Sequence, residues 1–153
     1  MKTLLICLMF MTFATSLAEA QSAPDQPNQP SFLVGVKATM QKYLGRPYVW
    51  GSSGIKSFDC SGFVWRVLYE NGVLMKRTTA RKFFLTLPPA TKTDQSAFGT
   101  LVFFDDLKHM GIVDDADTFY HSEVSIGTNR SKLNSFWRKK VYGYRKLPVP
   151  ETN

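Results

Sequence analysis

The chain has 153 residues, a formal net charge of +7 and many aromatic residues, with 12 Phe, 6 Tyr and 3 Trp. This length suits a single domain with its own core, and the aromatic content supplies enough apolar surface to bury. The basic residues are spread along the chain and match no nucleic-acid-binding motif, so we predict no nucleic-acid partner. The charge indicates attraction to a polyanion such as a cell wall, without naming it.

The first twenty residues have the layout of a secretory signal peptide. Lys2 precedes an apolar run from Leu4 to Phe13, and Ala18-Glu19-Ala20 is a small-x-small cleavage site. The apolar run is too short to span a bilayer with margin, so we expect cleavage, no stable membrane insertion, and a secreted or periplasmic protein. Residues 21–30 are rich in Pro, Gln, Ser and Asn and predict a disordered leader. The folded domain is expected at 31–149.

Helices are predicted in the first half of this domain. Apolar residues recur at helical spacing from Ser31 to Tyr43. After a loop rich in Gly and Pro, a helix is expected to begin near Cys60, capped by Asp59 and stopped at Asn71-Gly72. A short helix is expected from Arg77 to Leu85, before a Pro-Pro pair.

Strands are predicted in the second half. The β-rich or alternating runs are 99–104, 109–113, 118–122 and 141–147. Because helices come first and strands that pair antiparallel come afterwards, the pattern predicts an α+β fold.

Cys60 is the main candidate for chemistry. The chain has two cysteines, and cleavage would remove Cys7. A single exported cysteine indicates an intermolecular disulfide, a buried inert thiol or a nucleophile. At the first turn of a helix, unpaired N–H groups and the helix dipole are expected to lower the thiol pKa. The same N–H groups suit the oxyanion of a tetrahedral intermediate.

The chain has two histidines, His109 and His121, and each falls in a predicted strand. If these strands are adjacent, one imidazole can accept the Cys60 proton while the other orients it. Taken alone, each histidine is also compatible with a buried structural role. A Cys-His-His zinc site is the competing use, but the spacing matches no zinc motif and supplies three ligands only. We therefore predict no metal.

Four segments together resemble the NlpC/P60 cysteine peptidases. They are GRPYVWGSSGIKSFDCSGFVWRVL, GTLVFF, HMGIV and TFYHSEVSIGTNRSKLNSFWRKKVYGYRKL, in the family's order and at comparable separations. The resemblance covers about residues 32–147. It implies a papain-like α+β fold, with the nucleophile at a helix N-terminus packed on an antiparallel sheet.

The resemblance also implies roles for individual residues. Cys60 matches the nucleophile, His109 the general base, His121 the residue that orients the base, and Tyr48 a tyrosine that assists the oxyanion site. Residues expected to contact substrate are Asp59, Ser61 and, on weaker grounds, Thr78. The implied activity is hydrolysis of peptidoglycan stem peptides at the bond between γ-D-glutamate and the diamino acid, without a cofactor.

Other functions stay open at this point. Ser52 and Ser53 stand where relatives carry a second glycine, Thr100 replaces an aspartate, Lys82 replaces a glutamine and residues 124–130 differ, so the substrate is less defined than the catalytic set. The alternatives are a papain-like amidase or acyltransferase, a wall-degrading toxin, a non-catalytic wall-binding module, and a dimer linked through Cys60. A regulatory protein partner is conceivable and is not identified by the sequence.

Overall fold

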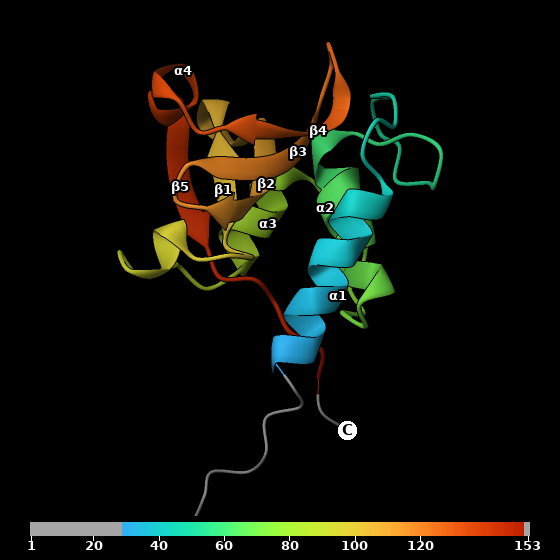
Figure 1. Ribbon diagram of the computed structural model, residues 1–153, viewed down its shortest axis with the longest axis horizontal. Coiled ribbons are helices and arrows are strands. Elements are labelled where there is room, and N and C mark those ends of the chain that lie inside the picture. Colours follow the sequence, from blue (N-terminus) through green and yellow to red (C-terminus); the bar gives the residue numbers. More distant parts are fainter. Residues whose placement is uncertain (1–28, 152–153) are drawn as a thin grey trace, which may run out of the picture.

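The computed structural model describes residues 29–151, which form helices packed on one antiparallel sheet (Figure 1). The predicted signal peptide and the leader up to residue 28 lie outside the described residues. No helix between residues 29 and 151 is long and apolar enough to cross a membrane. The elements are α1 (Gln29–Lys42), α2 (Cys60–Glu70), α3 (Ala80–Thr86), η1 (Asp94–Ser96), β1 (Leu101–Phe104), η2 (Asp105–Leu107), β2 (His109–Asp115), β3 (Thr118–Glu123), β4 (Gly127–Lys132), α4 (Ser135–Arg138) and β5 (Val141–Arg145).

The sheet has the strand order β4-β3-β2-β1-β5, and every neighbouring pair is antiparallel. Strands β1 to β4 follow one another across the sheet, and β5 returns to the free edge of β1. Because side chains alternate along a strand, the sheet has two apolar faces. One face packs on α2 and includes Leu101 and Phe103. The other packs under α4 and includes Val102 and Phe104.

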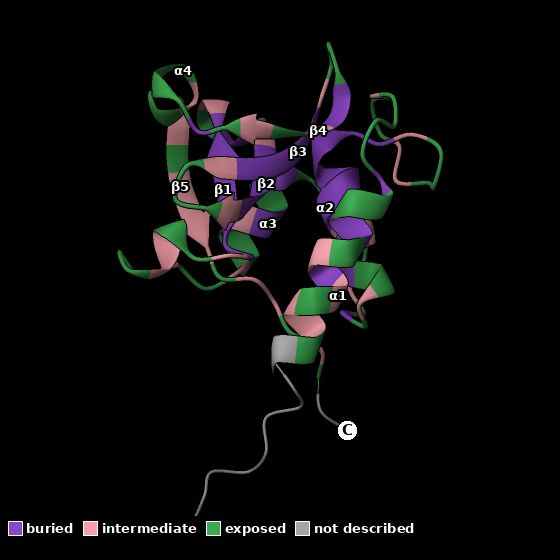
Figure 2. Cartoon of the chain, viewed as in Figure 1, coloured by how far each residue is buried: buried purple, intermediate pink, exposed green. Residues whose placement is uncertain are grey.

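Helix α2 lies at the centre of the fold and is buried along much of its length (Figure 2). Asp59 caps its N-terminus, because the side chain accepts a hydrogen bond from the backbone N–H of Gly62. Phe63, Val64, Val67 and Leu68 are fully buried. Burying side chains of this size stabilises the fold by about 1.5–3 kcal/mol each relative to exposure. This packing sets α2 against β2 and β3.

The predicted fold class is confirmed, and so are the types of the elements that the sequence indicated. Helix α3 begins three residues later than expected because Thr79 is its cap and accepts a hydrogen bond from the N–H of Lys82. Helix α1 begins at Gln29, inside the segment predicted as a leader. Four short elements were not predicted: the strand β4, the one-turn helix α4 and the 3-10 turns η1 and η2. Strand β4 is an edge strand with a mostly polar sequence, so it carries little of the apolar alternation that marks a strand.

Gly62 permits a close contact between α2 and the preceding loop. A Cβ at this position would lie 2.0 Å from the carbonyl oxygen of Ser52. That carbonyl accepts the N–H of Asp59, so it cannot move freely. The absence of a side chain at Gly62 therefore lets the loop before Cys60 pack directly against the first turn of α2.

Gly62→Ala is expected to lower the free energy of unfolding by about 1–3 kcal/mol, because the added methyl group overpacks the start of α2. The measurement is chemical denaturation followed by circular dichroism. Gly54→Ala is the matched control, since a Cβ at Gly54 meets no atom within 4 Å. Equal stability of the two variants would contradict the close contact.

Candidate active site

Three of the four residues predicted for catalysis, Cys60 and the two histidines, come from adjoining elements. Cys60 is the first residue of α2, His109 is the first residue of β2, and His121 lies on β3. Gly111 of β2 is paired with His121, so His109, two residues away on the same face, is its diagonal neighbour. A Cβ at Gly111 would lie 3.2 Å from the Cβ of His121 and 2.6 Å from the carbonyl oxygen of Tyr120. The glycine thus makes room for the second imidazole beside the first.

The two imidazoles are hydrogen-bonded to each other. His109 Nε2 and His121 Nδ1 are 2.8 Å apart, and the ring planes are at 80°. Cys60 Sγ lies 3.8 Å from the carbonyl oxygen of Lys108, the residue immediately before His109. The backbone N–H groups of Met110 and Ser61 also act on the sulfur. The cysteine is therefore next to the start of β2, where the first histidine is found.

Aromatic rings surround the histidines. Trp137 of α4 stacks on His109, with ring centroids 5.5 Å apart and planes at 25°, and meets His121 edge-on at 5.0 Å. Phe104 and Phe119 contact the same pair from β1 and β3. Because these rings exclude water, the imidazoles sit in a low-dielectric environment. His121 has no exposed surface.

Burial raises the pKa of the Cys60 thiol to about 11, and the negative charge of Asp59 acts in the same direction. The N–H groups of Met110 and Ser61 and the charge of Arg77 lower it by less. The position at the helix N-terminus is as predicted, but the expected lowering of the thiol pKa is wrong. The side chain is buried, with Cys60 only 5% exposed, and desolvation outweighs the helix terminus.

Burial also lowers the pKa of both histidines. The pKa of His109 falls to about 4, partly offset by the charge of Asp105. The pKa of His121 falls to about 3, through burial and then through the neighbouring His109, with the Asn129 side chain acting in the opposite direction. The resting site near neutral pH is therefore a neutral thiol beside two neutral imidazoles.

Tyr48 lies beside the loop that enters α2. It forms a parallel bridge with Phe58, two residues before the cysteine, and its pKa is raised by burial and by the charges of Cys60 and Asp59. Thr78 is partly buried and accepts, through its carbonyl, a hydrogen bond from the Arg77 guanidinium.

Asp59 and Ser61 are buried and bonded within the chain. Besides Gly62, the Asp59 carboxylate accepts hydrogen bonds from Gly51 N at 2.8 Å, from Ser61 Oγ at 3.0 Å and from Arg77 at 2.7 Å. The structure thus gives Asp59 a capping and bridging role. Contact of Asp59, Ser61 or Thr78 with substrate stays a prediction.

Four polar residues near the site were not singled out from the sequence. Arg77 pairs with Asp59 across 18 residues of chain. On β3 and β4, His121 Nε2 lies 3.0 Å from Ser131 Oγ, and the contacts continue to Asn129 and Glu123. Asn129 and Ser131 are two residues apart on β4, so they lie on the same face of the sheet. This spacing becomes a signal only when residues 127–132 are recognised as a strand.

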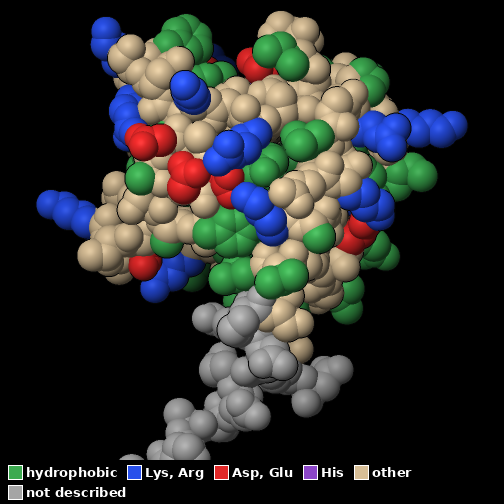
Figure 3. Space-filling view, in the orientation of Figure 1, with side chains coloured by type: hydrophobic (Ala, Val, Ile, Leu, Met, Phe, Trp, Pro, Cys, Tyr) green, Lys and Arg blue, Asp and Glu red, His purple; other side chains and the backbone are tan. Residues whose placement is uncertain are grey.

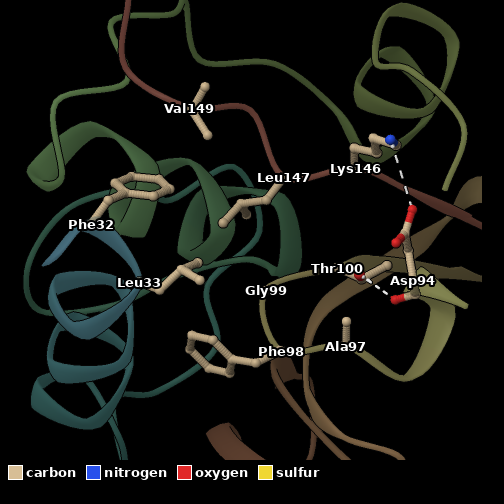
Figure 4. A pocket seen from close by; sticks show the side chains of 10 residues that line it. All are labelled: Phe32, Leu33, Asp94, Ala97, Phe98, Gly99, Thr100, Lys146, Leu147 and Val149. Atoms are coloured by element: carbon tan, nitrogen blue, oxygen red, sulfur yellow. Dashed lines mark hydrogen bonds and ion pairs between the residues drawn. The ribbon is translucent and has the colours of Figure 1, made fainter. Parts of the chain in front are cut away.

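No group of three or more His, Cys, Asp or Glu side chains that suits a metal ion is found within residues 29–151. One pocket, lined by parts of α1, the η1 region and the C-terminal segment, contains none of the predicted site residues (Figure 4). Asp94 and Lys146 form an ion pair there at 3.8 Å, and Thr100 Oγ1 donates to the carbonyl oxygen of Asp94. The ion pair joins the C-terminal segment to the η1 region.

Comparison with known proteins identifies the family. The NlpC/P60 family pattern matches residues 45–146, which include all four candidate catalytic residues, Tyr48 among them. The chain belongs to the NlpC/P60 family.

The relatives are named as endopeptidases and hydrolases. The chain is 40% identical over 80 residues to the probable endopeptidase p60 of Listeria seeligeri, covering 49% of this chain and 14% of that protein. It is 30% identical to the probable endopeptidase NlpC of Escherichia coli, covering 75% and 78%. It is 28% identical to the gamma-DL-glutamyl hydrolase of Bacillus subtilis, covering 78% and 31%. The chain thus spans only a minor part of p60 but most of NlpC.

A solved structure has the same fold. An NLP/P60 family protein of Staphylococcus aureus, described as similar to lipoprotein, superposes with a TM-score of 0.67 at 25% identity, covering 80% of this chain and 42% of that chain. The predicted family and its papain-like architecture are both confirmed.

The two histidines are expected to stay neutral from pH 8 to about 5, because burial holds their pKa values at about 4 and about 3. Nuclear magnetic resonance titration of the imidazole signals measures this directly, since the chain has two histidines in all. The folded pKa values lie below the ordinary 6.5, so the unfolded chain binds more protons below that pH. Stability present above pH 6.5 is therefore lost as the pH falls toward 4. Titration of either signal near pH 6.5 would contradict the burial argument.

Proposed function

We propose that the chain is an exported cysteine peptidase that hydrolyses peptidoglycan stem peptides at the bond between γ-D-glutamate and the diamino acid. The single observation that carries the proposal is the hydrogen-bonded His109–His121 pair beside a buried cysteine at a helix N-terminus. The probable peptidoglycan endopeptidase LytE of Bacillus subtilis, 33% identical over 109 residues and covering 68% of this chain and 31% of that protein, supports peptidoglycan as the substrate class. The gamma-DL-glutamyl hydrolase supports the choice of a γ-glutamyl bond. The predicted signal peptide supports export.

Cys60 is proposed as the nucleophile and His109 as the general base. The resting thiol is neutral, so proton transfer from Sγ to His109 accompanies attack on the scissile carbonyl. The C–S bond forms as the carbonyl π pair moves to oxygen. The oxyanion is placed against the N–H of Cys60 at the open end of α2, with the Tyr48 hydroxyl as the second donor. His121 Nδ1 accepts a hydrogen bond from the Nε2–H of His109 and keeps that ring oriented.

Collapse of the tetrahedral intermediate breaks the C–N bond. The leaving amine takes the proton from His109, and a thioester on Cys60 remains. Water then attacks the thioester with His109 again as base, which releases the carboxylic acid and restores the thiol. Every proton moves between Sγ, His109, the substrate and water, so the proposed reaction requires no added cofactor.

Surface charge is compatible with a polyanionic wall as the location of the substrate. Lys and Arg side chains are scattered over the face seen in Figure 3, and Asp and Glu side chains lie among them. Several of the acidic groups are paired with basic ones, as in Arg130 with Asp114 and Asp115. On this face the basic side chains do not form a separate patch, which favours general attraction over a defined binding patch.

Cys60→Ala is expected to abolish hydrolysis and to leave the fold intact, because the residue is small and removal of its sulfur removes the nucleophile. The measurement is digestion of purified peptidoglycan and of defined stem peptides, with products identified by mass spectrometry. Fragments from the wild type alone, cut after γ-D-glutamate, are the expected result. Hydrolysis by the variant would contradict the mechanism.

Gly54→Ala serves as the matched control, since it changes an exposed glycine in the neighbouring loop. If neither the wild type nor Gly54→Ala releases fragments although a thiol probe labels Cys60 in both, the substrate of the peptidase proposal is wrong. An amidase or acyltransferase acting on another acyl group would then replace it.

A further inference from the structure

The pair of histidines is the start of a longer polar chain. His121 Nε2 lies 3.0 Å from Ser131 Oγ, and Ser131 Oγ lies 2.7 Å from Asn129 Oδ1. Asn129 Nδ2 in turn lies 3.0 Å from a carboxylate oxygen of Glu123. The contacts run from β2 through β3 to β4 and end at the β3–β4 hairpin. They connect the candidate base to a carboxylate that is largely shielded from water, with a side chain 21% exposed.

The direction of each hydrogen bond is determined from the Glu123 end. Asn129 Nδ2 faces the carboxylate and also the carbonyl oxygen of Gly127, at 3.0 Å each. Both partners only accept, so the nitrogen of the amide must occupy this position. The amide oxygen Oδ1 therefore faces Ser131. Because Oδ1 only accepts, the Ser131 hydroxyl must donate its proton to Asn129.

This direction determines the tautomers of both histidines. Since the Ser131 proton is directed at Asn129, Ser131 Oγ can only accept from His121, which must carry its proton on Nε2. A neutral His121 then has a lone pair on Nδ1, and His109 must donate from Nε2 across the 2.8 Å contact. His109 is left with its lone pair on Nδ1, the one nitrogen that is still able to accept the Cys60 proton.

We propose that Ser131, Asn129 and Glu123 are positioning residues that hold both histidines in the Nε2–H tautomer and so keep His109 Nδ1 available as the base. Without them, His121 can carry its proton on Nδ1 and donate it in the hydrogen bond to His109. His109 Nε2 would then be the acceptor, and the His109 proton would lie on Nδ1. The inference rests on the proposed function for its catalytic consequence. The tautomers themselves are a property of the folded protein.

The first test reads the tautomers without any substrate. Nitrogen-15 magnetic resonance of imidazole-labelled full-length protein at pH 7 distinguishes Nδ1–H from Nε2–H, and the chain has two histidines. Both rings are expected as Nε2–H in the wild type and in Cys60→Ala. A ring in the Nδ1–H form would overturn the proposal, and this result stands whether or not the protein cleaves peptidoglycan.

The second test uses two substitutions of equal shape at position 131. Ser131→Thr keeps the hydroxyl, and Ser131→Val replaces it with a methyl group; both residue types suit a strand. On stem peptides, Ser131→Val is expected to lower kcat by about 10- to 100-fold with KM nearly unchanged, by analogy with the groups that orient metal-bound histidines. Ser131→Thr is expected to keep most of the wild-type kcat. Equal kcat for the two variants would overturn the proposal.

Two further variants separate positioning from folding. Glu123→Gln replaces the carboxylate at the end of the hydrogen-bonded series with an amide that can also donate, so a mixture of histidine tautomers is expected. This variant keeps the proposal testable if Ser131→Val fails to fold. His121→Asn retains an acceptor for His109 Nε2–H but removes the link to Ser131. In that background Ser131→Val is expected to cost no further activity, and a full additional loss would contradict the coupling. Ser125→Val, at the exposed tip of the same hairpin, is the control expected to keep wild-type kcat.

Discussion

The Asp59 carboxylate holds together the segments on which the site depends. It caps the first turn of α2 and also bonds Gly51 of the preceding loop and Arg77 of the segment before α3. This carboxylate is 9% exposed, and its two oxygens both accept from one nitrogen, Nη2 of Arg77, in a charge-assisted contact that is stronger than a neutral hydrogen bond. Because Cys60 follows Asp59 directly, the anchor determines where the sulfur is held. The same charge opposes formation of a thiolate next to it.

The site therefore combines a well-placed candidate nucleophile with an environment that keeps it protonated. Burial raises the thiol pKa to about 11 and lowers the pKa of His109 to about 4, so an ion pair is unfavourable at rest. Trp137 contributes to this environment by stacking on His109 from α4. A site of this kind depends on a base whose lone pair is already directed correctly, because no charge attraction aligns it. In this account, the hydrogen bonds from His121 to Ser131 and Asn129 meet the requirement, because they determine which nitrogen of each histidine carries the proton.

Local patterns predicted much of the fold and the catalytic candidates. The Asp59 cap, the stop at Asn71-Gly72 and the strands that carry His109 and His121 are short-range features, and the resemblance to a family assigned their roles. Strand β4 was missed because an edge strand needs no apolar alternation. Missing it also concealed Ser131 and Asn129, whose function depends on pairing with β3.

The predicted direction of the Cys60 pKa shift was wrong for a related reason. A helix N-terminus can be recognised from a few residues, whereas burial depends on side chains from distant parts of the chain. The Arg77–Asp59 pair likewise joins positions 18 residues apart and leaves no local pattern. Contacts of this kind are visible only after the chain is folded.

The most direct test of the central claim is to trap the covalent intermediate. The protein would be mixed with a defined stem peptide, quenched with acid at early times and digested for peptide mass spectrometry. The account predicts an acyl group of the γ-D-glutamyl fragment on the peptide that contains Cys60, formed before the free acid is released. Product release with no adduct on Cys60 at any time, or an adduct on another residue, would contradict it.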